Sequence, residues 1–392
     1  MPSSPPRRLA LLGSTGSIGR NVLDVVASLP GQFEIVGLAA GDNVEGLAEQ
    51  VAAVRPRVVA LRTAAAAAAL RQRLGAGAAE IEILHGREGL RTVAVDSGAQ
   101  MLVAAIVGVA GLEAIHAALA AGCDLALANK EALVVAGSLL LAEARLSGAA
   151  VLPVDSEHSA IHQCLRAGAP AEVQRLVLTA SGGPLRHFSA AELAQVTPAQ
   201  ALRHPTWSMG DRISLDSATL MNKGFEVIEA CHLFGLPEDR VEVLVHPQSI
   251  VHSLVEFVDG SVLAQLGTTD MRTPIQYALS YPARLPSGRM RLKLEEVGRL
   301  DFELPDVQRF PCLRLAREAW RAGGGAAAVL NAADEIVLAA FGAGRIGFGA
   351  IAMVVEECLQ RLGAPAVENL DAVLELDAQA RRMATELLAR YC

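Results

Sequence analysis

The chain has 392 residues, of which 52% are hydrophobic, 19% charged and only 4% aromatic. This length and apolar content suffice for a large buried core and predict two or three domains, packed mainly by aliphatic side chains. The formal net charge of −8 provides no field that would attract nucleic acid, and no cluster of Lys and Arg compensates for it. We therefore expect no nucleic-acid partner, and local charges must bind any anionic ligand.

The cysteines and the first residues of the chain indicate in which cellular compartment the protein is expected. No Cys-x-x-Cys or zinc-ligand spacing occurs among the six cysteines, which are Cys123, Cys164, Cys231, Cys312, Cys358 and Cys392. The apolar run at 9–12 leads directly into glycines and is too short for a secretory signal or a membrane span. We expect unpaired thiols in a reducing cytoplasm and no membrane partner.

The first 150 residues predict a dinucleotide-binding domain. A buried strand at 8–12 ends in Gly13-Ser14-Thr15-Gly16-Ser17-Ile18-Gly19, and a helix at 21–29 and a strand at 33–39 follow. The order of strand, glycine-rich turn, helix and strand is typical of the βαβ unit that binds a pyrophosphate on backbone N–H groups. The glycine spacing G-x-x-G-x-x-G also fits an ordinary tight turn. Strands and helices continue to alternate up to residue 128, which predicts an α/β fold with a doubly wound, mostly parallel (Rossmann-type) sheet.

Polar residues follow two later strands. Asn129-Lys130-Glu131 comes after the strand at 125–128, at the sheet edge where open α/β proteins bind ligands, but a helix start with Lys130 in solvent is the alternative. Asp155 and Glu157 come after the strand at 149–154, and in an extended segment both carboxylates would face one Mg²⁺ or Mn²⁺. The competing interpretation is a helix N-terminus capped by Ser156.

A third carboxylate, Glu226, lies on a helix expected to start near Asp216 and Ser217, three residues after Lys223. An isolated surface pair would explain Lys223 and Glu226 equally well. Upstream, the turn Ser181-Gly182-Gly183-Pro184 allows close approach of backbone N–H groups to an anion, so with Ser217, Asn222 and Lys223 it could surround a phosphate. By itself, such a sequence is only a turn.

The polar segment 185–210 ends in Pro205, Trp207 and Met209, which suits a mobile cover with an apolar tip. Four helical patterns from residue 312 onwards predict a small bundle. Within it, Asp334 and Glu335 resemble an active-site carboxylate pair, but we expect a solvated helix start. The predicted domains are 1–150 for the dinucleotide, a central α+β catalytic domain at 151–290, a linker at 291–311 and the bundle at 312–392.

Taken together, these motifs resemble the 1-deoxy-D-xylulose 5-phosphate reductoisomerase family over nearly the whole chain. The resemblance rests on eight segments, at residues 12–19, 129–131, 153–161, 178–184, 204–210, 213–230, 246–253 and 270–275. It implies an enzyme that rearranges 1-deoxy-D-xylulose 5-phosphate to an aldehyde and reduces it with NADPH to 2-C-methyl-D-erythritol 4-phosphate, in isoprenoid precursor biosynthesis. A divalent cation, Mg²⁺ or Mn²⁺, would polarise the substrate carbonyl, and the family suggests a homodimer.

The resemblance also implies roles for individual residues. The metal ligands would be Asp155, Glu157 and Glu226. Catalytic roles would fall to Lys130, Glu157 and His204. Substrate binding would involve Ser156, Ser181, His204, Ser217, Asn222, Lys223 and Glu226. Cofactor binding would involve Thr15, Gly16, Ser17, Ile18, Gly41, Asn43, Asn129, Glu131, Met209 and Gly210.

Asp42 departs from the family pattern, in which a basic residue is frequent at this position. An acid at the end of the second strand typically binds the ribose 2′-OH of NAD and repels the 2′-phosphate of NADP. We still expect NADPH, with weaker discrimination against NADH. Two rival functions remain open from the residues: a metal-independent NAD(P) dehydrogenase, whose activity would survive chelation, and a non-catalytic nucleotide sensor, which the three carboxylates argue against.

Overall fold

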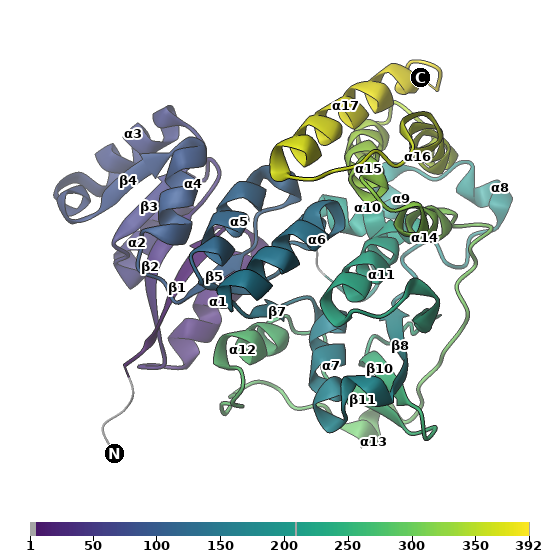
Figure 1. The fold of residues 1–392 in the computed structure, drawn as a ribbon, viewed down its shortest axis with the longest axis horizontal. Helices are drawn as coiled ribbons and strands as arrows, with labels where there is room; N and C mark the ends of the chain where they lie inside the picture. Colours follow the sequence, from purple (N-terminus) through teal and green to yellow (C-terminus); the bar gives the residue numbers. More distant parts are fainter. Residues whose placement is uncertain (1–4, 208–209, 392) are drawn as a thin grey trace. The chain divides into compact units, whose positions relative to one another are not determined.

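The computed structural model describes residues 5–207 and 210–391. Two compact units divide these residues. The first unit comprises the residues up to Ala132 together with Leu140–Ser159 and Asp270–Arg289, and the second comprises Leu133–Leu139, Ala160–Thr269 and the residues from Met290 onwards. Both units are drawn in Figure 1.

In its described residues, the first unit contains a seven-stranded parallel sheet with the strand order β4-β3-β2-β1-β5-β6-β7. The strands are β1 (Arg7–Leu12), β2 (Phe33–Ala39), β3 (Val58–Leu61), β4 (Glu82–His85), β5 (Met101–Ala104), β6 (Asp124–Leu127) and β7 (Val151–Pro153). The order reverses between β1 and β5, which is the switch point where open sheets of this type bind ligands. The predicted doubly wound sheet is confirmed.

Helices connect successive strands of this sheet. They are α1 (Ser17–Ser28), α2 (Val44–Val54), α3 (Ala64–Leu74), α4 (Gly86–Val95), α5 (Leu112–Ala120) and α6 (Lys130–Ser147). A further helix of the unit, α12 (Arg272–Ser280), comes later in the chain and packs on α1. The alanine-rich α3 is a surface helix, capped by Thr63 and anchored by Leu70. The core is aliphatic: Leu9 and Leu11 of β1 pack with Val22 and Val25 of α1, and Ile275 of α12 joins the same cluster. This core holds the first turn of α1 at the end of β1.

The second unit contains a sheet with the order β11-β10-β8-β9, in which β8 pairs parallel with β9 and antiparallel with β10. Its strands are β8 (Val173–Ala180), β9 (Val241–Val245), β10 (Val251–Phe257) and β11 (Val262–Leu266). The helices of this region are α7 (Ser156–Cys164), α8 (Ala190–Leu193), α9 (Pro198–Ala201), α10 (Asp211–Thr219), α11 (Met221–Phe234) and α13 (Leu294–Val297). Short 3₁₀ turns in the two units are η1 (Gly75–Glu80), η2 (Gly108–Gly111), η3 (Leu165–Ala167), η4 (Pro170–Glu172) and η5 (Glu238–Arg240).

The predicted helical bundle is confirmed: α14 (Cys312–Ala322), α15 (Ala326–Gly342), α16 (Phe348–Leu362) and α17 (Leu370–Leu388) pack together in the second unit (Figure 1). The bundle also supports α11, because a Cβ added at Gly224 would lie 2.5 Å from the Cβ of Ala316 on α14. Only a residue without a side chain permits this approach. The helix that carries Lys223 and Glu226 is thereby held against α14.

The expectation of a solvated helix start around Asp334 is wrong. Asn331 and Asp334 lie inside α15 and have no exposed surface. Burial, followed by the charge of Asp216, raises the pKa of the Asp334 carboxyl well above its usual range. Asp334 is therefore a buried acid of the bundle and not a surface residue.

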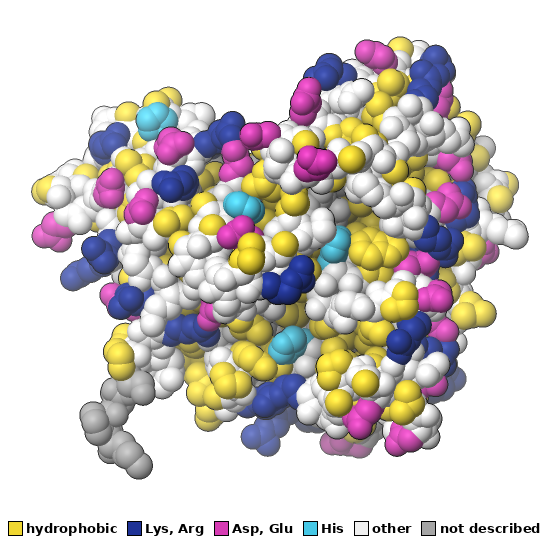
Figure 2. All heavy atoms as spheres, viewed as in Figure 1, with side chains coloured by type: hydrophobic (Ala, Val, Ile, Leu, Met, Phe, Trp, Pro, Cys, Tyr) yellow, Lys and Arg dark blue, Asp and Glu magenta, His cyan; other side chains and the backbone are white. Residues whose placement is uncertain are grey.

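Three features of the structure concern membrane spans, surface charge and the cysteines. None of the helices built from the described residues combines the length and apolar character needed to span a bilayer. On the face of the molecule shown in Figure 2, acidic and basic side chains are interspersed. The five described cysteines are all buried and unpaired with one another.

Candidate active site

The turn between β1 and α1 is built for close approach of its backbone to a ligand. Gly13 has a φ of +84°, and a Cβ there would collide with the carbonyl oxygen of Ala105 after β5. A Cβ at Gly19 would collide with the carbonyl oxygens of Gly13 and Ser14. Gly16 precedes the helix and offers no side-chain cap to its first N–H groups. The predicted pyrophosphate residues, Thr15, Gly16, Ser17 and Ile18, therefore form a tight turn with a helix N-terminus available for an anion.

A surface cavity of about 580 Å³ adjoins this turn. It is lined by Thr15, Ser17, Arg20, Asn21, Leu23, Asp24, Asn43, Gly46, Glu49 and Gln50. Oε1 of Gln50 is buried and has no hydrogen-bond partner among the described residues. A polar wall with an unsatisfied buried oxygen suits a hydroxyl-bearing ligand such as a dinucleotide.

The same cavity also reaches the loop after β2, where one further predicted cofactor residue, Asn43, lines it. Asn43 lines the cavity, and its Oδ1 accepts a hydrogen bond from the backbone N–H of Gly46, 2.9 Å away, at the start of α2. Gly41 precedes it on the same loop. The carboxylate of Asp42 forms an ion pair with Arg62, the first residue after β3. Arg62 was not among the predicted site residues.

Asn129 and Glu131 fix the start of α6. The Nδ2 of Asn129 donates to the carbonyl oxygen of Gly108, 2.9 Å away, and its Oδ1 caps the helix at Ala132 N–H, 2.8 Å away. Oε1 of Glu131 accepts a hydrogen bond from Gly108 N–H, 3.3 Å away. Both side chains are buried. They therefore hold the loop after β5 against the loop after β6, at the edge of the sheet where the cofactor residues were predicted.

The predicted helix start is confirmed, because α6 begins at Lys130, but the expectation that Lys130 lies in solvent is wrong. Its Nζ lies 2.7 Å from Oδ2 of Asp155, and the two side chains are 11% and 16% exposed. Nδ1 of His158, a fully buried histidine that the sequence did not single out, lies 3.8 Å from the same oxygen. Parallel pairing of β6 with β7 brings the residues after these strands together.

The extended geometry predicted for Asp155 and Glu157 is wrong, because α7 begins at Ser156. The carbonyl oxygen of Asp155 accepts a hydrogen bond from Ser159 N–H, 2.8 Å away, as the residue before a helix does. Oδ1 of Asp155 accepts from Ser156 N–H, and Ser156 Oγ donates to Oε2 of Glu157, 2.5 Å away. The two carboxylates are thus placed by a helix N-terminus, where negative charge is stabilised.

Ser181 and His204 form a hydrogen-bonded pair in the second unit. Nδ1 of His204 accepts hydrogen bonds from the backbone N–H groups of Thr206 and Trp207, at 3.2 and 2.9 Å. The ring proton therefore lies on Nε2, which donates to Ser181 Oγ, 2.8 Å away. Gly183 N–H donates to the same oxygen. Since Oγ accepts from both, its own proton is directed to a further acceptor, such as a phosphate oxygen.

Burial lowers the pKa of His204 below its ordinary value. The accepting role of Nδ1 acts in the same direction, because a protonated ring would place a hydrogen where two N–H groups already donate. His204 is therefore neutral at physiological pH and acts as a hydrogen-bond donor through Nε2.

The predicted phosphate residues lie around the break between two helices. The sequence predicted one helix starting near Asp216, but α10 ends at Thr219 and α11 begins at Met221, separated by Leu220 with a φ of +61°. A Cβ at Gly183 would lie 2.6 Å from the carbonyl oxygen of Ser217, so the Ser181-Gly182-Gly183 turn packs directly on α10. The turn and Ser217 are thus neighbours, as the sequence predicted.

Lys223 and Glu226 are not a surface pair. Lys223 is 3% exposed and Glu226 is 1% exposed. Nδ2 of Asn222 donates to Oε1 of Glu226, 2.7 Å away, and the Lys223 ammonium forms an ion pair with Oε2 of the same carboxylate. A buried carboxylate requires such partners, and a buried charge cluster of this kind is typical of a functional site.

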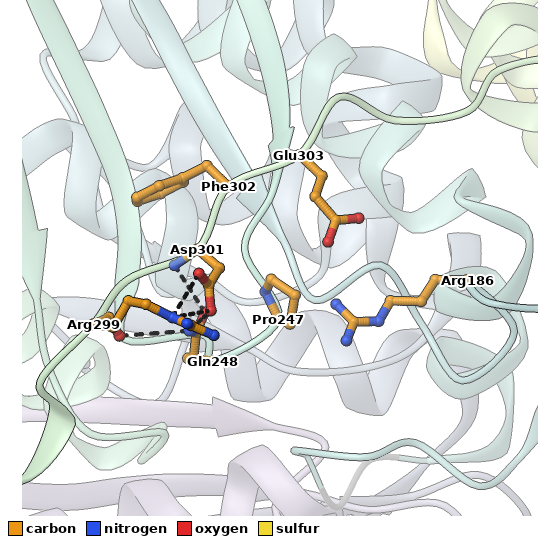
Figure 3. A pocket seen from close by; sticks show the side chains of 7 residues that line it. All are labelled: Arg186, Pro247, Gln248, Arg299, Asp301, Phe302 and Glu303. Atoms are coloured by element: carbon orange, nitrogen blue, oxygen red, sulfur yellow. Dashed lines mark hydrogen bonds and ion pairs between the residues drawn. The ribbon is translucent and has the colours of Figure 1, made fainter.

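A second basic group, which the sequence did not single out, lies next to the glycine turn. A Cβ at Gly182 would lie 3.1 Å from Cδ of Arg186. Arg186 also lines a cavity whose other residues are Pro247, Gln248, Arg299, Asp301, Phe302 and Glu303 (Figure 3). Gln248 Nε2 donates to Asp301 Oδ2, 2.8 Å away, which ties the turn after β9 to the segment before α14. The only sequence signal for Arg186 was its place just after the turn.

The predicted cover of the site is partly described. Capping boxes begin α8 at Ser189 and α9 at Thr197, and Leu193 and Ala201 are buried. The Trp207 ring lies 6.3 Å from the ring of His252. Gly210 is the residue before α10. Met209, predicted to lie near the nicotinamide, is outside the described residues.

A doubly wound sheet with a glycine turn and an adjoining cavity, in a chain that also buries carboxylates and a lysine, defines the class of dinucleotide-dependent oxidoreductases. Three family models match the chain: 1-deoxy-D-xylulose 5-phosphate reductoisomerase at residues 9–137, its C-terminal domain at 151–234, and the DXP reductoisomerase C-terminal domain at 266–383. The chain belongs to the 1-deoxy-D-xylulose 5-phosphate reductoisomerase family.

Individual relatives agree with this assignment. The 1-deoxy-D-xylulose 5-phosphate reductoisomerase of Xanthomonas campestris pv. campestris (strain 8004) is 52% identical over 392 residues, which cover 100% of this chain and 99% of the relative. The solved reductoisomerase from Zymomonas mobilis in complex with NADPH has a TM-score of 0.92 at 43% identity and covers 98% of this chain and 99% of its own. A solved DOX-P reductoisomerase in complex with NADPH, fosmidomycin and magnesium has the same TM-score and identity, covering 98% of both chains.

Proposed function

We propose that this protein catalyses the NADPH-dependent and divalent-metal-dependent rearrangement and reduction of 1-deoxy-D-xylulose 5-phosphate to 2-C-methyl-D-erythritol 4-phosphate, a step of isoprenoid precursor biosynthesis. The observation that carries the proposal is the 52% identity with the Xanthomonas enzyme along the whole chain. The solved relatives described as containing NADPH and magnesium support the choice of cofactors.

The proposed metal ligands are Asp155 and Glu157 of the first unit and Glu226 of the second. Their chemistry fits Mg²⁺ or Mn²⁺, since both prefer carboxylate oxygens and keep positions for substrate oxygens. When bound, such a cation polarises the substrate carbonyl and stabilises developing negative charge. Within each unit, a lysine forms an ion pair with one of these carboxylates: Lys130 with Asp155, and Lys223 with Glu226.

The proposed phosphate site consists of Ser181, Ser217, Asn222 and Lys223. One support is the packing of the glycine turn on Ser217. The other is Ser181 Oγ, which accepts hydrogen bonds from His204 Nε2 and Gly183 N–H and can therefore donate its own proton to a phosphate oxygen. Lys223 supplies the charge that an overall acidic protein needs to bind an anion locally. Ser156 and His204 are proposed to bind substrate hydroxyls.

Proton transfers are proposed to involve Lys130 and His204, and Glu157 is proposed as a further catalytic residue. Lys130 is held by Asp155 at 2.7 Å, and Glu157 accepts a hydrogen bond from Ser156. Neutral His204 can donate from Nε2. Exclusion of water is needed because a free aldehyde and an enolate-like species would otherwise be lost, and we assign this to the segment 181–210, including Trp207 and Met209.

For NADPH, the proposed contacts in the first unit are Thr15, Gly16, Ser17 and Ile18 for the pyrophosphate, Gly41 and Asn43 for the ribose side, and Asn129 and Glu131 at the end of β6. Met209 is proposed to lie near the nicotinamide, and Gly210 is proposed as a further cofactor-binding residue. NADPH supplies the hydride for reduction of the rearranged aldehyde. We further propose a homodimer in the cytoplasm; the absence of disulfides among the described cysteines is compatible with a reducing compartment.

One assay tests the proposal: NADPH oxidation with 1-deoxy-D-xylulose 5-phosphate, with and without a divalent metal. We expect oxidation that requires both the substrate and the metal. Activity that survives complete chelation would favour a metal-independent dehydrogenase, and no turnover under any metal condition would favour a nucleotide sensor.

A further inference from the structure

An ion pair lies at the carboxyl ends of β2 and β3. Asp42 follows β2 after two residues, and Arg62 directly follows β3; their side chains are paired. The backbone places the pair, because Arg62 N–H donates to the carbonyl oxygen of Gly41, 3.2 Å away, and β2 and β3 are parallel neighbours. The side chains are exposed, at 45% for Asp42 and 72% for Arg62.

The pair adjoins the proposed ribose end of the cofactor site. Asn43, the residue after Asp42, lines the same cavity as Thr15 and Ser17 of the glycine turn. In doubly wound folds, the pyrophosphate binds after the first strand and the adenosine ribose near the end of the second. The end of β3 is the next strand end along the sheet, and the hydrogen bond from Arg62 N–H to the carbonyl oxygen of Gly41 places Arg62 beside the loop that carries Asn43.

We propose that Arg62 binds the 2′-phosphate of NADPH and supplies the positive charge that Asp42 does not. The inference rests on the proposed function, because it concerns the cofactor of that reaction. An arginine donates two parallel hydrogen bonds to a phosphate, and this geometry is stronger than a single contact with a carboxylate. An exposed ion pair is weak, so the guanidinium can exchange Asp42 for the phosphate.

The arrangement predicts opposite effects for its two members. Without Arg62, Asp42 would face the 2′-phosphate alone and repel it. Without the charge of Asp42, Arg62 would be fully available to the phosphate. If Asp42 instead bound the ribose 2′-OH, as in NAD enzymes, its loss would weaken ligands that carry a 2′-OH.

The test is isothermal titration calorimetry of the full-length enzyme with 2′,5′-ADP, which carries the 2′-phosphate, and with 5′-AMP, which does not. We expect Arg62→Ala to weaken 2′,5′-ADP by about ten- to a hundredfold, the cost of one charge-assisted hydrogen-bonded contact, and to leave 5′-AMP unchanged. Asp42→Asn should tighten 2′,5′-ADP severalfold. The matched control is Arg87→Ala, which removes an arginine of 73% exposure that is paired with Glu113 in the same unit, and it should change neither ligand.

Three results would overturn the inference: equal losses for both ligands in Arg62→Ala, no loss for 2′,5′-ADP, or an Asp42→Asn variant that binds 2′,5′-ADP more weakly. Failure of the inference is distinguishable from failure of the proposed function. If the wild type prefers 2′,5′-ADP and Arg62→Ala keeps that preference, only the role of Arg62 is wrong. If the wild type does not distinguish the two ligands, the assignment of NADPH is wrong as well.

Discussion

Nζ of Lys130 lies 2.7 Å from Oδ2 of Asp155, so the lysine at the start of α6 is paired with the aspartate before α7. Both residues follow adjacent parallel strands, β6 and β7. The pair places a proposed proton-transfer group on a proposed metal ligand. A cation bound by Asp155 would therefore change the environment of Lys130 directly, because the two positive charges would share one carboxylate.

Loss of a metal ligand should remove most of the activity while the fold is kept. We expect Asp155→Asn and Glu226→Gln each to lower turnover by about a thousandfold, since a bound cation lowers a barrier by several kcal/mol. Glu143→Gln, which changes a carboxylate on the same helix as Lys130, is the control and should retain activity. Near-normal turnover of either ligand variant at ordinary metal concentration would contradict the assignment.

Lys223 should contribute to phosphate binding. Loss of a charge-assisted hydrogen bond costs roughly 1.5–3 kcal/mol, so Lys223→Ala should weaken substrate binding by about ten- to a hundredfold. Because the ammonium also pairs with Glu226, Ser217→Ala is the cleaner second variant. Both variants are compared on the substrate and on an analogue without the phosphate. A deficit of Lys223→Ala that is the same for both compounds would show that Lys223 acts only through Glu226.

His204 should titrate below the ordinary histidine pKa of about 6.5, because burial disfavours its charged form. When the pKa of a histidine is lower in the folded than in the unfolded protein, its contribution to the free energy of unfolding is fully present at a pH above the unfolded-state pKa. That contribution is lost as the pH falls through the folded-state pKa. NMR titration of its ring protons should show this lowered pKa. Thermal unfolding of His204→Asn should depend less on pH below 6.5 than that of the wild type; equal slopes would contradict the prediction.

Asp334→Asn should stabilise the protein at neutral and alkaline pH. Burial raises the pKa of Asp334, so its protonated form contributes stability at low pH that is lost as the pH rises through the folded value. Asparagine does not titrate, and we expect an increase in Tm of roughly a few degrees at pH 8 that diminishes toward low pH. Glu386→Gln, at an exposed position of α17, is the control. A variant less stable than the wild type at pH 8 would contradict the prediction.

The segment around Trp207 should respond to ligand. The other tryptophan, Trp320, packs edge-to-face on His232 with 4.7 Å between ring centroids, and Trp320→Phe leaves Trp207 as the reporter. Since capped helices anchor the segment at α8 and α9, we expect the fluorescence change to arise from the part near Trp207. The measurement adds substrate or a hydroxamate phosphonate to this variant. An unchanged spectrum would argue against closure.

The sequence by itself determined the parallel sheet, the glycine turn, the bundle and the chain positions of the candidate ligands. These features follow from local signals: the period of apolar residues, glycines at a tight turn and polar residues directly after strands. The neighbourhood of the Ser181-Gly182-Gly183 turn and Ser217 was also predicted, through the resemblance to a family.

Only the tertiary structure decided the local conformations and partners. Asp155 precedes a helix instead of lying in an extended segment, Leu220 divides a helix expected to be continuous, and Asp334 is buried where solvent was expected. Asp42 is paired with Arg62, twenty positions away in the chain. Burial and pairing of this kind depend on contacts between residues distant in sequence. Periodicity and composition do not encode such contacts, so local sequence patterns cannot predict them.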